Sequence, residues 1–310
     1  MFDHTILQVY FRNEFIAFKD ANISIANTGF LYGLGVFTGM RAHWNESKQE
    51  LYIFRAKEHY QRFYNSCKLC KFEGFTKNYS EKEFTAIIKK LLKINQIKQD
   101  AYIRVSEFVD EIQIGPKFGK YKDSLMVFLY PLGDYVPTQG MKCKVSSWVR
   151  VEDNAIPARA KIHGAYVNTA FAKTEAIDAG FDEALVMDKD GHIVEGSAEN
   201  FFMVRDGVLI TPPANANILE GITRKTVLEI AHDLKIPVVE RDIDRTEVYL
   251  ADEVFLSGTG AKVSPVTQID SYVIADGKIG SISKKIQDVY FRATKGEVKQ
   301  YEQWLTAVYE

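Results

Sequence analysis

The segment Pro131-Leu-Gly-Asp-Tyr-Val-Pro137 has a proline at each end, and strand-like sequence lies on both sides of it. Proline removes an amide donor and restricts the residue before it, so such a segment interrupts regular structure. We therefore predict a small domain over 1–130, an inter-domain loop over 131–140, and a larger domain over 141–310 that ends in a helix. A chain of 310 residues is long enough to form two hydrophobic cores.

Strand and helix patterns are mixed in both parts of the chain. The first 40 residues predict short strands and turns, with a hairpin around Arg12-Asn13 between strands at 7–11 and 14–18. Apolar residues at helical spacing predict the helices, and a capping box from Ser80 to Glu83 opens the second one. The helices are expected at 57–69, 80–94, 166–179, 222–234 and 282–291. Because helices and strands do not alternate regularly, we predict the α+β class.

Composition narrows the classes of partner. The formal net charge is −2 and no run of Lys or Arg stands out, which argues against nucleic acid or an acidic membrane as the main partner. Three cysteines, Cys67, Cys70 and Cys143, are too few for a disulfide framework and suit a reducing cytoplasm. Cys67 and Cys70 form a C-x-x-C without a thioredoxin-like context, so packing is favoured over a redox role. No signal-peptide or membrane-span pattern is found.

Two segments carry residues with catalytic potential. Lys161 lies between a proline-marked loop and Gly164, and a lysine that forms a Schiff base needs partial burial and a lowered pKa. A lysine at a strand end is otherwise a solvated surface residue. In Glu195-Gly-Ser-Ala-Glu-Asn200 a carboxylate stands beside a glycine, which suits contact with a protonated ring nitrogen. The same residues are also compatible with a polar turn.

Two further segments could bind an anion. Leu219-Glu-Gly-Ile-Thr-Arg224 opens a helix, where free amides and the helix dipole attract negative charge, although simple capping explains most helix starts. Ser257-Gly-Thr-Gly-Ala261 follows a strand and offers hydroxyls and glycines, as an ordinary turn also would. No nucleoside-triphosphate or dinucleotide-binding fingerprint is present in the sequence.

In order and spacing, the four segments together resemble the class IV (fold type IV) pyridoxal-phosphate (PLP) enzymes, and among them the branched-chain amino acid aminotransferases. The resemblance runs from Tyr32-Gly33 to the terminal helix. It implies a two-domain fold with a small α/β N-terminal domain and a larger C-terminal domain built on a β-barrel-like sheet. The motifs that carry it are Arg159-Ala-Lys161, Gly164-Ala-Tyr166-Val-Asn168, Glu195-Gly-Ser-Ala-Glu-Asn200, Leu209-Ile-Thr-Pro-Pro213, Glu220-Gly-Ile-Thr-Arg224, Ala251-Asp-Glu-Val-Phe255 and Ser257-Gly-Thr259.

The resemblance implies pyridoxal 5'-phosphate as the cofactor and assigns residues to it. Lys161 would form the Schiff base and then move the proton between the substrate Cα and the cofactor C4′. Glu195 would pair with the pyridinium nitrogen, and Tyr166 would donate to the phenolic oxygen. The phosphate would be bound by Arg62, Gly221, Ile222, Thr223, Gly258 and Thr259.

The resemblance also implies a substrate pocket. The residues that match it are Tyr32, Phe37, Gly39, Tyr102, Arg104, Tyr135, Gly260 and Ala261. Strand alternation places Tyr102 and Arg104 on one face. An apolar pocket with an arginine would accept both a branched aliphatic side chain and the γ-carboxylate of glutamate.

The sequence departs from the family pattern at four places. Thr38 stands where Glu is usual, Leu132 replaces a frequent Trp, Ala198 replaces a common Gly, and residues 105–116 replace a glycine-containing loop. We expect all four to lie near the substrate. His163 could contact the cofactor or substrate, or it could orient the loop that carries Lys161.

The leading hypothesis is transfer of the amino group from L-leucine, L-isoleucine or L-valine to 2-oxoglutarate by ping-pong half reactions. The alternatives within the fold are a D-amino acid transaminase and a 4-amino-4-deoxychorismate lyase, and a non-catalytic dimeric paralogue is a more remote one. The expected partners are amino acids, 2-oxo acids and a second copy of the chain, with assembly beyond the dimer left open. No nucleic acid, membrane or metal is expected.

Overall fold

The computed structural model describes residues 2–132 and 137–310. Contacts divide the chain into two compact units. The first comprises Met1–Gly133, Ala160–Gly164 and Ala293–Glu310, and the second comprises Asp134–Arg159 and Ala165–Arg292. The domain bounds of 1–130, 131–140 and 141–310 stay a prediction. The segments Ala160–Gly164 and Ala293–Glu310, which it assigns to the larger domain, make their contacts in the first unit.

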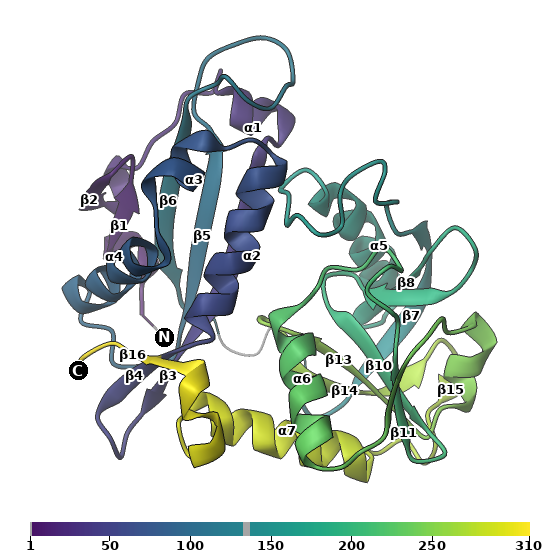
Figure 1. Ribbon diagram of the computed structural model, residues 1–310. Helices are drawn as coiled ribbons and strands as arrows, with labels where there is room; N and C mark the ends of the chain where they lie inside the picture. Colours follow the sequence, from purple (N-terminus) through teal and green to yellow (C-terminus); the bar gives the residue numbers. More distant parts are fainter. Residues whose placement is uncertain (1, 133–136) are drawn as a thin grey trace. The chain divides into compact units, whose positions relative to one another are not determined.

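The first unit is a seven-stranded sheet in the order β16-β4-β3-β5-β6-β1-β2, in which all neighbouring strands are antiparallel. Helices α2, α3 and α4 pack against strands β3, β6 and β1 (Figure 1). Its elements are β1 (Gln8–Phe11), β2 (Glu14–Ala17), α1 (Thr28–Tyr32), β3 (Gly35–Asn45), β4 (Glu50–Phe54), α2 (Ala56–Leu69), α3 (Glu73–Asn78), α4 (Glu81–Ile94), β5 (Ala101–Val109), β6 (Asp123–Tyr130) and β16 (Leu305–Ala307).

Local sequence signals located several of these elements. Arg12 and Asn13 have φ angles of 51° and 70°, as a two-residue hairpin turn requires, and the Ser80–Glu83 capping box begins α4. The long strand β3 has no counterpart in the prediction, which gave short strands and turns over the first 40 residues. The expectation that a helix ends the fold was wrong, since β16 follows it and pairs with β4.

The second unit contains a sheet of nine strands that closes on itself. The pairing path β10-β13-β14-β7-β8-β9 returns to β10, while β11, β12 and β15 lie outside the ring. Closure buries the strand edges that would otherwise remain unpaired. Its elements are β7 (Met141–Val149), α5 (Tyr166–Asp178), β8 (Glu183–Met187), β9 (Ile193–Gly196), β10 (Asn200–Arg205), β11 (Val208–Thr211), α6 (Ile222–Asp233), β12 (Val238–Glu240), β13 (Glu253–Gly258), β14 (Lys262–Ile269), β15 (Tyr272–Val273) and α7 (Ser281–Thr294).

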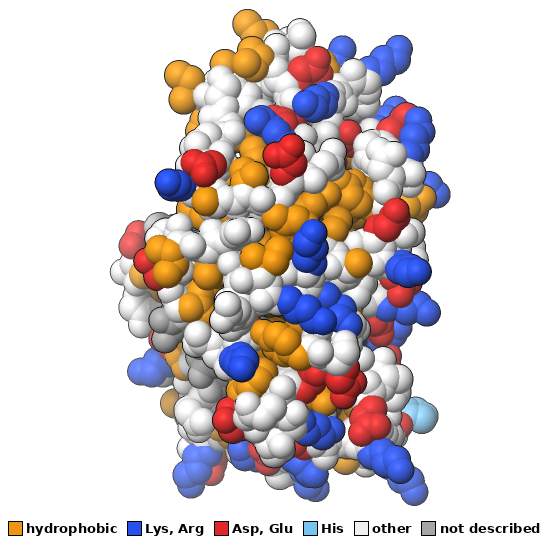
Figure 2. Space-filling model, turned by 90° about the vertical axis from the view of Figure 1, so that its left-hand side faces the viewer, with side chains coloured by type: hydrophobic (Ala, Val, Ile, Leu, Met, Phe, Trp, Pro, Cys, Tyr) orange, Lys and Arg blue, Asp and Glu red, His pale blue; other side chains and the backbone are white. Residues whose placement is uncertain are grey.

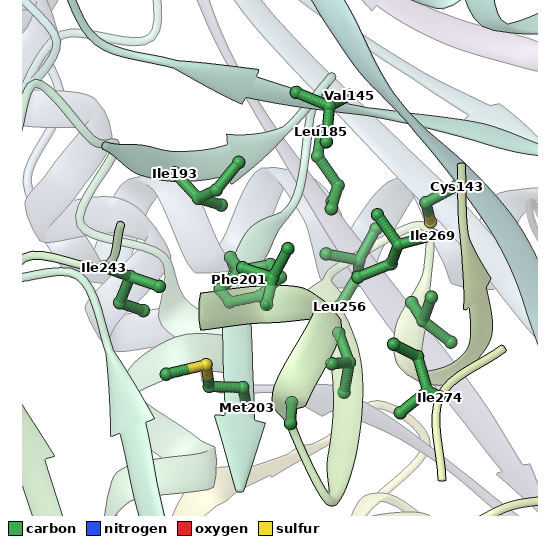
Figure 3. Close-up of a cluster of buried hydrophobic side chains, with 14 of the residues drawn as sticks. Cys143, Val145, Leu185, Ile193, Phe201, Met203, Ile243, Leu256, Ile269 and Ile274 are labelled. Carbon is green, nitrogen blue, oxygen red and sulfur yellow. The ribbon is translucent and has the colours of Figure 1, made fainter. Parts of the chain in front are cut away.

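A hydrophobic core fills the interior of this ring. Cys143, Leu185, Phe201, Leu256 and Ile269 come from five different strands and are fully buried (Figure 3). Alternation along each strand sends every second side chain inward, so strands distant in sequence share one core. This packing fixes the strand ends that carry Glu195 and the turn after β13.

One face of the molecule carries basic and acidic side chains side by side, without a broad field of one sign (Figure 2). Within the part of the chain that the structure describes, no helix has the length and apolar character of a membrane span. No group of His, Cys, Asp or Glu among the described residues has a metal-binding arrangement.

Candidate active site

The segment that carries Lys161 is attached to the edge of β3. The Phe37 amide donates to the Lys161 carbonyl at 2.9 Å, the His163 amide donates to the Gly35 carbonyl at 2.8 Å, and Val36 and Ile162 form a β-bridge. β4 pairs with β3 only from Ala42 onward, so the first half of this edge is open to the segment. Lys161 is therefore held by backbone pairing.

Lys161 has neighbours from a strand and from a helix. Its amide donates to the Ser66 hydroxyl of α2 at 3.2 Å, and Ser66 donates in turn to the Arg62 carbonyl at 3.0 Å. Its ammonium nitrogen lies 5.0 Å from the centre of the Phe37 ring. The side chain is only half-buried, beside an aromatic surface, which suits a lysine that must reach a small molecule.

Residues predicted to read the substrate share one face of the sheet. Phe37 and Gly39 lie opposite Ser106 and Arg104 in the β3–β5 pairing. The Arg104 guanidinium carbon is 4.1 Å from the centre of the Phe37 ring and 5.5 Å from that of Tyr102. The structure thus brings Phe37, Gly39, Tyr102 and Arg104 together, with Tyr102 and Arg104 on one face as strand alternation predicted.

Gly39 makes room for Tyr102. A Cβ at position 39 would overlap the Tyr102 hydroxyl and ring, so no other residue fits without moving that ring. The close approach of the Tyr102 ring, rather than an unusual backbone angle, explains why residue 39 is a glycine.

Arg41 was not assigned a role from the sequence. It lies opposite Tyr102 on the same face and is buried, and it donates to the Leu132 carbonyl at 3.0 Å. The alternation Phe37, Gly39, Arg41 along one strand was the signal that could have identified it. Leu132, one of the departures from the family, is thereby joined to this face through its backbone.

Arg62 and Thr38 lie on the opposite face of β3, toward α2. The Thr38 hydroxyl is fully buried, 3.3 Å from an Arg62 guanidinium nitrogen and 2.8 Å from His59 Nδ1. Alternation turns the Thr38 side chain away from Phe37 and Gly39, the residues on whose face we expect the substrate. Residues 105–109 continue β5, and the loop begins at Asp110.

His163 packs against the substrate-side face. Its ring lies 5.4 Å from that of Phe37, and Nε2 is 3.3 Å from the Ser106 hydroxyl. Burial, with the nearby positive charge of Arg104, lowers the pKa of His163 to about 4. The contacts favour orientation of the Lys161 segment over proton transfer at neutral pH.

Glu195 lies at a strand end in the second unit, in a row with Asn200 and Ser257 across β9, β10 and β13. One carboxylate oxygen accepts from Asn200 Nδ2 and from the Leu219 amide, both at 3.0 Å. The other oxygen lies 3.1 Å from Arg150 Nε. The sequence did not reveal a role for Arg150 or for Asn200. Arg150 contacts Glu195, and Asn200 contacts Leu219, across stretches of chain that no local pattern connects.

Asn200 also positions the start of α6. Its amide nitrogen donates to the Leu219 carbonyl at 2.9 Å, and its oxygen lies where a Cβ at Gly221 would be. Gly221 precedes α6 and has no side chain to cap it, so the first amides, those of Ile222 and Thr223, can serve an anion.

Ser257 provides a test of whether this region suits a phosphate. Its hydroxyl is buried and has no hydrogen-bond partner among the residues that the structure describes. Buried hydroxyls are normally paired, so a bound acceptor at this position would satisfy it. The residues around the start of α6 and the turn after β13 therefore fit a phosphate group.

The remaining predicted residues lie as follows. Gly258 ends β13, Thr259 and Gly260 form the turn, and the Ala261 carbonyl accepts from the Ser264 hydroxyl at 2.6 Å. Tyr166 begins α5, and Thr169, one turn later, donates to the Ser197 carbonyl at 2.9 Å, which ties this helix start to the Glu195 turn.

Three predicted or divergent residues need separate mention. Tyr32 is the last residue of α1 and more than a third exposed. Ala198, whose amide donates to the Glu199 carboxylate at 3.0 Å, lies beside Gly258. Tyr135 lies outside the described residues.

Comparison with known proteins decides the family. Residues 35–269 match the family described as amino-transferase class IV. This chain belongs to the class IV aminotransferases. The predicted family is confirmed, and so is the predicted fold, because branched-chain aminotransferases of known structure superpose on nearly the whole chain.

Three relatives illustrate how far this class IV aminotransferase resembles known ones. A probable branched-chain-amino-acid aminotransferase of Aquifex aeolicus is 44% identical over 97% of this chain and 96% of the relative. The branched-chain aminotransferase of Thermoproteus uzoniensis, solved with norvaline, is 37% identical with a TM-score of 0.91, covering 98% and 99% of the two chains. The branched-chain amino acid aminotransferase of Thermobaculum terrenum, solved in its PLP form, is 30% identical with a TM-score of 0.92, covering 99% and 100%.

Proposed function

We propose that this class IV aminotransferase transfers the amino group of L-leucine, L-isoleucine or L-valine to 2-oxoglutarate. The observation that carries the proposal is the arrangement around Lys161: an aromatic ring, Phe37, and a guanidinium, Arg104, lie 4.1 Å apart beside it. An apolar surface suits a branched aliphatic side chain, and a guanidinium suits the second carboxylate of glutamate. The names of the relatives point to the same substrates.

The cofactor of the proposed reaction is pyridoxal 5'-phosphate, whose ring acts as an electron sink for the bonds at the substrate Cα. Lys161 would hold the cofactor and move the proton at the substrate Cα. Glu195, held by Arg150 and Asn200, would keep the ring nitrogen protonated. Tyr166 would donate to the ring oxygen. The residues that would hold the phosphate are Arg62, Gly221, Ile222, Thr223, Gly258 and Thr259.

The substrate is bound mainly by the face of the first sheet. Phe37, Tyr102 and Arg104 contact it there, and Gly39 keeps the Tyr102 ring in place. We assign Tyr32 and Tyr135 to the edge of the pocket, and Gly260 and Ala261 to the α-carboxylate. The reaction is ping-pong, because one site serves the amino acid and then the 2-oxo acid.

We further propose a cytoplasmic homodimer. Free, buried cysteines suit a reducing compartment. A second copy of the chain is the expected partner, and size-exclusion chromatography with light scattering measures it directly. A monomeric holoenzyme with full activity would contradict the dimer.

A panel of amino donors in both enantiomers tests the substrate. We expect L-leucine, L-isoleucine and L-valine to convert the holoenzyme to its amino form, seen as loss of the long-wavelength cofactor absorbance, and 2-oxoglutarate to restore it. Reaction with D-amino acids alone would identify a D-amino acid transaminase. Pyruvate release from aminodeoxychorismate without an acceptor would identify the lyase.

A Lys161→Ala variant tests the catalytic residue. We expect it to lose transamination by more than a thousandfold while the far-ultraviolet circular dichroism and the thermal midpoint of unfolding stay near those of the wild type, because Lys161 is held by its backbone. Lys89→Ala, which changes another half-buried lysine, on α4, is the control. Undiminished transamination in Lys161→Ala would refute Lys161 as the catalytic residue, and absence of transamination in the wild-type holoenzyme would support the non-catalytic paralogue.

A further inference from the structure

The proposed function gives Arg62 to the cofactor phosphate, and the inference drawn next rests on that assignment. We propose that Thr38 is a positioning residue for Arg62: its hydroxyl holds the guanidinium in place without adding negative charge, and it does so through a hydrogen-bond chain that ends on neutral His59. This makes Thr38 a determinant of phosphate affinity rather than of substrate choice.

The directions of the hydrogen bonds follow from the chemistry of the groups. A guanidinium can only donate, so the Thr38 oxygen accepts from Arg62, over 3.3 Å. In the proposed chain the one hydroxyl hydrogen is directed to His59 Nδ1, 2.8 Å away. His59 then accepts at Nδ1 and carries its proton on Nε2.

The surroundings favour this neutral form of His59. The imidazole is buried, and Arg62, Lys161 and Arg55 all place positive charge near it, so the pKa of His59 is well below its usual value. The carboxylate of Glu58, the preceding residue in the chain, is paired with Arg55 at 2.8 Å. Proton uptake by His59 would break the chain, because Nδ1 could no longer accept from Thr38.

A hydroxyl and a carboxylate at position 38 would act differently on Arg62. A carboxylate at this buried position would form an ion pair with Arg62 and compete with a phosphate for its charge. A hydroxyl also anchors the guanidinium but leaves its charge to the ligand. Residue 38 therefore acts on the phosphate side of the site, away from the face with Phe37 and Arg104.

The affinity of the apoenzyme for three ligands tests the proposal: pyridoxal 5'-phosphate, pyridoxal without the phosphate, and inorganic phosphate as a competitor. In Thr38→Val, which has nearly the same shape without the hydroxyl, we expect the Kd for pyridoxal 5'-phosphate and the inhibition constant of phosphate to rise about tenfold. The Kd for pyridoxal should stay within about twofold. Thr38→Ser should retain the wild-type values. An unchanged Kd for the phosphate ligand in Thr38→Val would overturn the proposal.

Three further measurements separate positioning from loss of folding. Thr211→Val removes another fully buried hydroxyl, which donates to the Phe201 carbonyl, and should leave all three affinities unchanged. In an Arg62→Ala background, Thr38→Val should raise the Kd for pyridoxal 5'-phosphate by less than a further twofold, because Thr38 acts through Arg62. If Arg62→Ala itself leaves phosphate affinity unchanged, the assignment of Arg62 in the proposed function fails, whatever Thr38 does.

A measurement on the wild-type protein does not depend on any variant folding. Histidines labelled with ¹⁵N report the tautomer of each ring, and the chain has six of them, so His59→Gln identifies the signal. We expect a neutral ring with the proton on Nε2 from pH 6 to 8. A ring protonated on Nδ1 in this range would overturn the proposed chain.

Discussion

The backbone carbonyl of Lys161 accepts a hydrogen bond from the Phe37 amide at 2.9 Å, so the lysine is held by the strand that also supplies Thr38 and Gly39. Alternate residues of β3 point to opposite faces, with Phe37 and Gly39 on one and Thr38 on the other. Changes at neighbouring positions of one strand should therefore have separable effects on substrate and on phosphate binding.

Gly39→Ala should impair substrate binding. The new Cβ would overlap the Tyr102 hydroxyl and displace the ring from Arg104. We expect KM for the amino acid to rise about tenfold, which corresponds to about 1.4 kcal/mol, while the Kd for pyridoxal 5'-phosphate stays the same. Steady-state kinetics and cofactor titration measure the two. In a Tyr102→Ala background, Gly39→Ala should cause almost no further change in KM. Equal rises in KM for the amino acid and in the Kd for pyridoxal 5'-phosphate would contradict this account.

Asn200→Asp should weaken cofactor binding. The substitution replaces an amide donor by an oxygen that faces the Glu195 carboxylate and the Leu219 carbonyl at about 3 Å. A buried donor lost in this way costs about 1–3 kcal/mol, so we expect at least a tenfold rise in the Kd for pyridoxal 5'-phosphate and a lower thermal midpoint. Asn78→Asp, which removes an exposed amide donor to the Gly74 carbonyl, is the matched control. Wild-type affinity in Asn200→Asp would refute the role of Asn200.

His163 should make the protein less stable in acid. Its pKa is lowered to about 4, so between pH 6.5 and pH 4 the unfolded chain binds a proton that the folded chain does not. Stability therefore falls as the pH is lowered through this window, by an amount of the order of 2 kcal/mol.

Denaturant unfolding at pH 7, 6, 5 and 4.5 measures this loss of stability. His163→Gln, which cannot titrate, should make the dependence less steep, while buried His59, whose pKa is also lowered, continues to contribute to it. His232→Gln, which changes a highly exposed histidine, should leave the slope unchanged. An unchanged slope in His163→Gln would show that this histidine is not the titrating group.

The cysteines should be unreactive in the folded protein. Cys67, Cys70 and Cys143 are buried and free, and burial raises the pKa of all three thiols, that of Cys70 to about 11. We expect no reaction with a thiol-specific disulfide reagent at pH 8 under native conditions and three equivalents after denaturation. The variant Cys67→Ser/Cys70→Ser should retain its activity. Rapid reaction of two native thiols would favour a redox role for the C-x-x-C pair.

The sequence alone determined the features that depend on neighbouring residues. The hairpin at Arg12-Asn13, the capping box at Ser80–Glu83 and the helix that Tyr166 opens are local, because turn geometry and capping involve side chains only a few positions apart. The family was also readable, since its motifs are short and occur in a fixed order.

The tertiary structure decided which segments pair across long stretches of chain. The attachment of Lys161 to Phe37, the return of β16 to β4 and the closure of β9 onto β10 join residues that no local pattern connects. Thr38 shows the consequence most clearly. Its identity was visible in the sequence, but the face on which it lies, and its contact with Arg62 and His59, follow from strand pairing and from the packing of α2 against β3.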